Sequence, residues 1–127
     1  MQEKHLFEYA VIRVVPRVER EEFLNVGVIL YCRKQHFLQV MFGVDKERLR
    51  NFSIDLNIPE VEECLGAFTK ISEGNKQGGA IAKLPMAERF RWLTATRSTI
   101  VQTSPVHSGL CEDANETLVK LYEQLVK

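Results

Sequence analysis

The sequence carries no excess of charge of either sign, because its 17 Lys and Arg residues balance 17 Asp and Glu residues. Proteins that hold nucleic acid by bulk electrostatics need a basic surface that neutralises phosphates. The balanced charge therefore makes nucleic-acid binding the weakest of the functions considered, although a local basic patch stays compatible with the composition.

Long apolar runs are also missing, and no segment has the roughly 20 consecutive apolar residues that a transmembrane helix needs. The first residues, Met1 to His5, lack the apolar centre of a signal peptide. We therefore expect a cytoplasmic protein that does not enter a membrane.

Cysteine is scarce, and the three that occur, Cys32, Cys64 and Cys111, are widely spaced without any Cys-x-x-Cys pair. An odd number of distant cysteines is a poor disulfide framework, so reduced thiols are expected. His107 lies four residues before Cys111, but the short ligand pairs typical of zinc sites are absent. We predict Cys32 and Cys64 to be small core residues, and we expect neither a metal site nor a cofactor.

Hydrophobic residues, by contrast, make up 45% of the 127 residues. A chain of this length can bury a sufficient core without a metal or disulfides. No repeat, low-complexity tract or linker divides it, so residues 1–127 are predicted to form a single globular domain.

Strand-like segments dominate the first third of the chain. Residues 6–15 are apolar on both alternating faces, which predicts a central, covered strand that Pro16 ends. Residues 26–32 and 37–44 are further strands, and the short polar turn between them predicts an antiparallel hairpin. Gly27, inside the second strand, predicts a bulge or a close backbone approach.

Helical signals dominate the remainder. Asp45 can cap a short helix, Asn57 begins a longer one that Gly74 ends, and Asp113 begins the last helix. Residues 86–96 suit another helix, followed by a short β-prone run. This order predicts an α+β domain, with a mainly antiparallel sheet of about four strands and helices packed on one face.

Arg13 interrupts a strand that is otherwise apolar. A buried guanidinium must be paired, because an isolated charge is very costly to desolvate. Glu21 and Glu22 are candidate partners that would tie the strand to the following turn. The other interpretation is an anion site, since the planar fork of Arg suits phosphate or carboxylate.

Two more polar groups stand out. Arg17, Arg20, Glu22 and Asn25 precede the second strand, although Asn at a turn is explained by bonds to nearby backbone. Later, hydroxyl side chains that include Ser98 surround Arg97. They could ligate an anion, but capping of free backbone groups is the more common role of Ser and Thr. His107 is predicted to be a solvated loop histidine.

Arg89, Arg91 and Trp92 form a basic and aromatic group on one predicted helix. Arg and Trp are enriched in the energetically dominant residues of protein–protein interfaces, so this helix is a candidate interface. The alternative is that Trp92 anchors the core while the arginines stay in water.

The whole chain resembles a known family. Tyr9-Ala-Val-Ile-Arg13-Val-Val-Pro16, followed by Arg20-Glu-Glu22-Phe-Leu-Asn25-Val-Gly27-Val-Ile-Leu30, resembles the opening of the bacterial family of unknown function numbered 3037. Arg89-Phe-Arg-Trp92-Leu, Thr96-Arg97-Ser98, Gln102 and Ser104-Pro105-Val106 resemble the second half of that family.

The resemblance implies a bacterial cytoplasmic protein without an assigned activity. It also implies a protein partner, since members of the family are commonly encoded beside a HipA-type kinase-like protein. The polar motif residues of the family fall on Arg13, Arg20, Glu22, Asn25, Arg97 and Ser98.

The favoured hypothesis is therefore an accessory or interaction module that works with a kinase-like neighbour, and no catalytic residue is assigned. The alternative is a small anion- or nucleotide-binding domain that handles phosphoryl groups. In that case Arg13, Arg17, Arg20 and Arg97 hold the anion and Glu22 acts as base, so these side chains must converge in one pocket. An uncovered sheet edge or the Trp92 helix could also support a homodimer.

Overall fold

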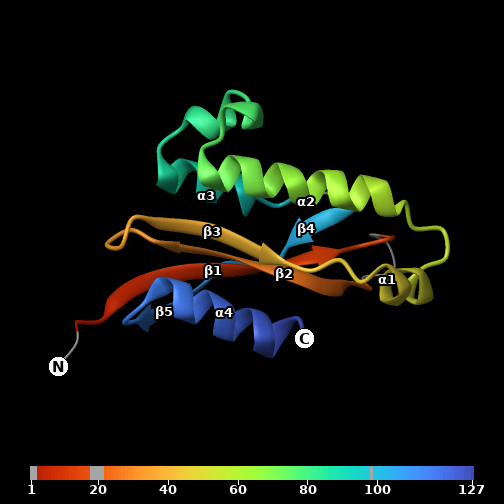
Figure 1. The fold of residues 1–127 in the computed structure, drawn as a ribbon, viewed down its shortest axis with the longest axis horizontal. Helices are drawn as coiled ribbons and strands as arrows, with labels where there is room; N and C mark the ends of the chain where they lie inside the picture. The colour runs from red at the N-terminus through yellow and green to blue at the C-terminus, as the bar shows by residue number, and fades with distance from the viewer. Residues whose placement is uncertain (1–2, 18–21, 98) are drawn as a thin grey trace.

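A computed structural model describes residues 3–17, 22–97 and 99–127. The first three strands form an antiparallel meander (Figure 1). β1 (His5–Val14) pairs with β2 (Leu24–Cys32), and β2 pairs with β3 (Phe37–Phe42). The predicted hairpin is confirmed, although the third strand ends two residues before the predicted boundary.

Two short strands share the other edge of β1. β4 (Val101–Thr103) pairs with Ile12–Val14, and β5 (His107–Cys111) pairs with His5–Tyr9, both antiparallel. The sequence predicts a sheet of about four strands, and the described residues form a sheet of five. His107, predicted to lie in a loop, is instead the first residue of β5, because the sheet resumes directly after the break at Pro105.

Helices cover both faces of the sheet, as Figure 1 shows. α2 (Ile58–Glu73) and α3 (Met86–Leu93) lie on one face, and α4 (Ala114–Leu125) lies on the other. The antiparallel α+β fold is confirmed, but the prediction that helices pack on one face only is wrong. The reason is that β1 and β2 are apolar at both alternating sets of positions, so each face must be covered.

The two faces have separate cores. Ile12 and Ile29 belong to the cluster that packs against α2 and α3. Val28 and Leu30 belong to the cluster that includes Leu118 of α4. Side chains alternate along a strand, so neighbouring residues of β2 supply opposite cores.

The predicted helix boundaries follow the capping residues. Asp45 caps α1 (Lys46–Phe52), Asn57 caps α2 and Asp113 caps α4, each accepting backbone N–H bonds. Gly74 ends α2 in the left-handed conformation, with φ of 71°. The short helices η2 (Lys76–Gly78) and η3 (Ile81–Lys83) then lead to α3, which ends at Leu93 rather than Thr96.

Gly27 is required where β2 and β3 approach closely, as the sequence predicted. A Cβ atom at this position would lie 2.7 Å from the carbonyl oxygen of Met41 and 2.8 Å from Cβ of Phe42. The register between β1 and β2 also shifts next to it, between Ile12 and Arg13. That irregularity brings Arg13 opposite Asn25.

Cys32 and Cys111 are buried, whereas Cys64 is only half-buried on α2. The prediction of a core cysteine is therefore confirmed for Cys32 and only partly met for Cys64. No helix among the described residues combines the length and the apolar character needed to cross a membrane.

Candidate functional site

Arg13 and Asn25 lie together on the α4 face of the sheet. Ile12 and Val14 point into the core under α2 and α3, so the intervening Arg13 projects to the opposite face. Asn25 pairs with Arg13 in register, and its Nδ2 donates to the carbonyl oxygen of Leu125 at the end of α4, at 3.0 Å.

The guanidinium of Arg13 contacts an aromatic ring. It stacks over Phe23, with Cζ 4.0 Å from the ring centroid, and burial lowers its pKa from the ordinary value. Nε of Arg13 and Oδ1 of Asn25 are buried without a hydrogen-bond partner among the described residues. Of the two carboxylates predicted to pair with Arg13, Glu21 lies outside the described residues.

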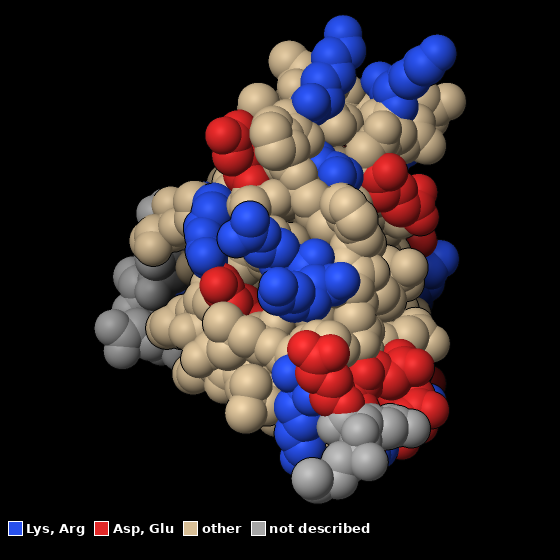
Figure 2. Space-filling model, turned by 90° about the vertical axis from the view of Figure 1, so that its left-hand side faces the viewer, with Lys and Arg blue, Asp and Glu red and all other residues tan. Residues whose placement is uncertain are grey.

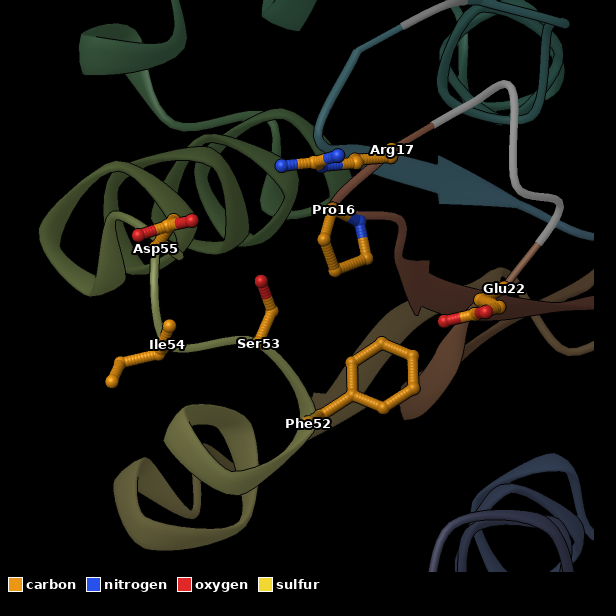
Figure 3. A pocket seen from close by; sticks show the side chains of 7 residues that line it. All are labelled: Pro16, Arg17, Glu22, Phe52, Ser53, Ile54 and Asp55. Carbon is orange, nitrogen blue, oxygen red and sulfur yellow. The ribbon is translucent and has the colours of Figure 1, made fainter.

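Glu22 lines a hollow of about 240 Å³ at the end of β1 (Figure 3). Arg17 reaches across this hollow toward Asp55, and the hydroxyl of Ser53 points into the space between them. The segment after α1, which supplies Ser53 and Asp55, carried no recognisable signal in the sequence because only the fold brings it here. Among the residues that the structure describes, the lining of this hollow carries one guanidinium and two carboxylates, a balance that does not favour an anion.

Arg97 lies on the opposite face of the sheet from Arg13. Its guanidinium stacks on Trp92 at 4.7 Å and donates to the carbonyl oxygens of Trp92 and Ala95. Together with Cys64 and other residues it lines an apolar hollow of about 170 Å³ beside α2, and burial lowers its pKa. The structure therefore does not bring Arg97 to Arg13.

Two of the predicted site residues, Arg20 and Ser98, lie outside the described residues. Of the six predicted residues, the structure brings Arg13 and Asn25 together and places Glu22 in the hollow at the end of β1. A single pocket that contains both Arg13 and Arg97, which the anion-binding hypothesis required, is not formed.

The three residues of the candidate interface have different roles. Arg89 is half-buried and donates to the carbonyl oxygens of Ile71 (3.1 Å), Ser72 (2.9 Å) and Leu84 (3.0 Å). It thus satisfies free carbonyls at the end of α2 and serves the fold. Trp92 stays 41% exposed, so it does not anchor the core.

Arg91 joins α3 to the sheet. It forms a two-pronged ion pair with Glu8 of β1, with N–O distances of 2.5 and 2.9 Å. The bond to Glu8 is the main cause that raises the pKa of Arg91. The ion pair therefore links α3 directly to the first half of β1.

A groove of about 570 Å³ opens between α3 and the hairpin end of the sheet, and we call it the α3 groove. It is larger than the hollows beside Arg17 and Arg97, and its lining includes both basic and apolar side chains. Its lining residues are Leu6, Glu8, Tyr31, Arg33, Lys34, Ala87 and Arg91. Figure 2 looks onto this end of the molecule and shows Lys and Arg side chains gathered near its centre.

Next to the α3 groove, two leucines are left uncovered. Leu6 of β1 and Leu110 of β5 are directly paired in register, and they are 59% and 64% exposed. They lie on the α3 face, because Leu6 alternates with Phe7 of the α4 core. No described strand pairs with the outer edge of β5 beside them.

Among residues 3–17, 22–97 and 99–127, no three His, Cys, Asp or Glu side chains gather as metal ligands would. In comparisons with known proteins, one family model matches residues 9–126, and it is described as a protein of unknown function (DUF3037). Neither the curated proteins nor the solved structures gave a match.

Proposed function

Because the chain belongs to the DUF3037 family, whose description assigns no activity, we propose a function from its surface: it is an interaction module that binds a partner protein through the α3 groove. The observation that carries the proposal is the exposed pair Leu6 and Leu110 at the border of this groove.

Two large side chains facing each other across neighbouring strands form a continuous apolar patch rather than scattered exposed residues. Such patches, when rimmed by polar groups, mark interaction sites. Here Arg33, Lys34 and Arg91 supply the rim. A partner that covers Leu6 and Leu110 would remove their apolar surface from water, which is the main favourable term in association.

The groove is also held in shape before any partner arrives. The ion pair of Arg91 with Glu8 joins α3 to β1, and Tyr31 stacks on Phe90 with ring centroids 5.4 Å apart. A preformed surface loses less conformational entropy on binding than a flexible one. This supports a docking role for the hairpin end of the molecule.

The alternative of an anion- or nucleotide-binding domain has less support from the geometry. Arg13 and Arg97 lie on opposite faces, and the described residues that line the hollow with Arg17 and Glu22 carry more negative than positive charge. The sequence resemblance supports a bacterial cytoplasmic protein. The first partner to test is the kinase-like protein that the resemblance implies.

The test is capture of the partner from native cells by the tagged protein, quantified by mass spectrometry. Leu6→Ser and Leu110→Ser together should abolish stoichiometric capture, because they remove the apolar patch. Ile54→Ser is the matched control, since Ile54 is 89% exposed and lines the hollow at the other end of the sheet. Equal capture by all variants would refute docking at the α3 groove.

A further inference from the structure

We infer that the α3 groove binds an extended, acidic segment of a partner protein that carries at least one large apolar side chain. The inference rests on the proposed function and names the chemistry of the partner. It is carried by the charge balance of the groove and by its apolar floor.

The charge balance is set by three cations and one carboxylate. Glu8 is occupied by Arg91, with which it forms both hydrogen bonds. Arg33 and Lys34 are exposed at the hairpin end of β2, and no ion pair to either is found among the described residues. The groove therefore keeps two adjacent positive charges that repel each other, and a carboxylate from a partner would relieve this repulsion.

The floor is apolar and lies beside these charges. Leu6 from the sheet and Ala87 from α3 line the groove, and the small exposed part of Tyr31 adds to this lining. A volume of about 570 Å³ is in the range of roughly 300–1,000 Å³ that ligand sites occupy. An apolar side chain on Leu6 and a carboxylate at Arg33 or Lys34 can thus be bound at the same time.

Nucleic acid fits the same groove less well. Its affinity comes from many phosphate contacts, whereas the described lining of the groove offers Arg33 and Lys34 beyond the compensated Arg91. The leucines give no hydrogen bond to a phosphate or a base edge. An acidic, apolar peptide uses both halves of the surface.

The test is fluorescence anisotropy with three labelled twelve-residue peptides and the intact protein. One peptide alternates Asp or Glu with Leu, the second replaces its acids with Lys, and the third replaces Leu with Ser. The first should bind, and the other two should bind about tenfold more weakly or not at all. Affinity for the first should fall as salt is raised.

The variant pair separates this groove from general basic surface. R33E with K34E should weaken the acidic peptide about tenfold, because two attractions become repulsions. K76E with K83E is the control, since Lys76 and Lys83 are exposed residues of η2 and η3 outside the groove lining. This control should change affinity little, and its thermal unfolding should match the test variant.

Three outcomes would overturn the inference. They are no binding of the acidic peptide, equal loss in both charge-reversed variants, or tighter binding of a labelled single-stranded oligonucleotide. If the peptide fails while cellular capture still depends on Leu6 and Leu110, only the peptide chemistry is wrong. If capture does not depend on these leucines, the proposed function itself fails.

Discussion

Val11 and Ser104 are joined by two hydrogen bonds across the edge of the sheet. The N–H of Ser104 donates to the carbonyl oxygen of Val11 at 2.8 Å, and the N–H of Val11 donates to Oγ of Ser104 at 2.9 Å. A side-chain oxygen thus takes the place of a backbone carbonyl at the point where Pro105 interrupts the ladder. This relationship lets β4 and β5 share one edge of β1, and it carries β5 and Leu110 to the border of the α3 groove.

Ser104→Ala should therefore destabilise the protein although it removes only one atom. The Val11 N–H would be left buried without a partner, which costs about 1–3 kcal/mol in the free energy of unfolding. Urea unfolding followed by circular dichroism measures the change. Ser108→Ala is the control, because Ser108 is exposed on β5 and should change stability by less than about 0.5 kcal/mol. Equal effects at both sites would show that the Ser104 bond has no special role.

Two glycines give a prediction of opposite sign. Gly27→Ala should destabilise by about 1–3 kcal/mol, since the added Cβ would overlap the backbone of β3 at 2.7 Å. Gly66→Ala on α2 should stabilise by about 0.5–1 kcal/mol, because nothing lies within 4 Å of a Cβ there and Ala is the better helix former. Thermal unfolding of both variants checks the pair, and a stabilised Gly27→Ala would contradict the strand packing.

Local features of the fold could be predicted from the sequence because they depend on neighbouring residues. Asp45, Asn57 and Asp113 cap helices through bonds to backbone two or three residues later. The pairing of Leu6 with Leu110 could not be predicted in this way, because the strand register joins residues more than a hundred positions apart.

The candidate site shows the same limit. The sequence pattern singles out Arg13 in an apolar strand, Asn25 before a strand and Arg97 among hydroxyl side chains, but the faces on which they lie depend on the path of the whole sheet. Whether helices cover one face or both was decided by the alternation in β2, where Ile29 and Leu30 serve different cores. Because both alternating sets of positions in β2 are apolar, a helix such as α4 must cover the second face.

Arg89 and Arg91 differ in how much they should contribute to stability. Arg89 binds backbone carbonyls, whereas Arg91 forms an ion pair at the surface. Arg89→Ala should cost about 2–3 kcal/mol, because it frees three carbonyl oxygens at and after the end of α2 from a charged donor. Arg91→Ala should cost at most about 1 kcal/mol, since its pair with Glu8 is solvent-exposed. Chemical denaturation of both variants tests the order. The reverse order would mean that the ion pair to β1, and not the cap on α2, secures α3.

The thiol of Cys111 predicts how stability changes at alkaline pH. Burial, and secondarily the neighbouring Cys32, raise the pKa of Cys111 above its ordinary value. The folded protein then holds the thiol proton more tightly than the unfolded chain does. The resulting stabilisation is fully present below the ordinary thiol pKa of about 8.5 and is lost progressively as the pH rises from there through the higher folded value.

The Cys111 thiolate forms less readily in the native core than in the unfolded chain, so ionisation of this thiol favours unfolding. Above about pH 8.5 the unfolded chain releases the proton first, so the free energy of unfolding falls with rising pH. Cys111→Ala removes this term and should flatten the decline in Tm between pH 7 and 10, whatever its effect at neutral pH. A decline of unchanged slope would show that the alkaline loss of stability arises from other groups.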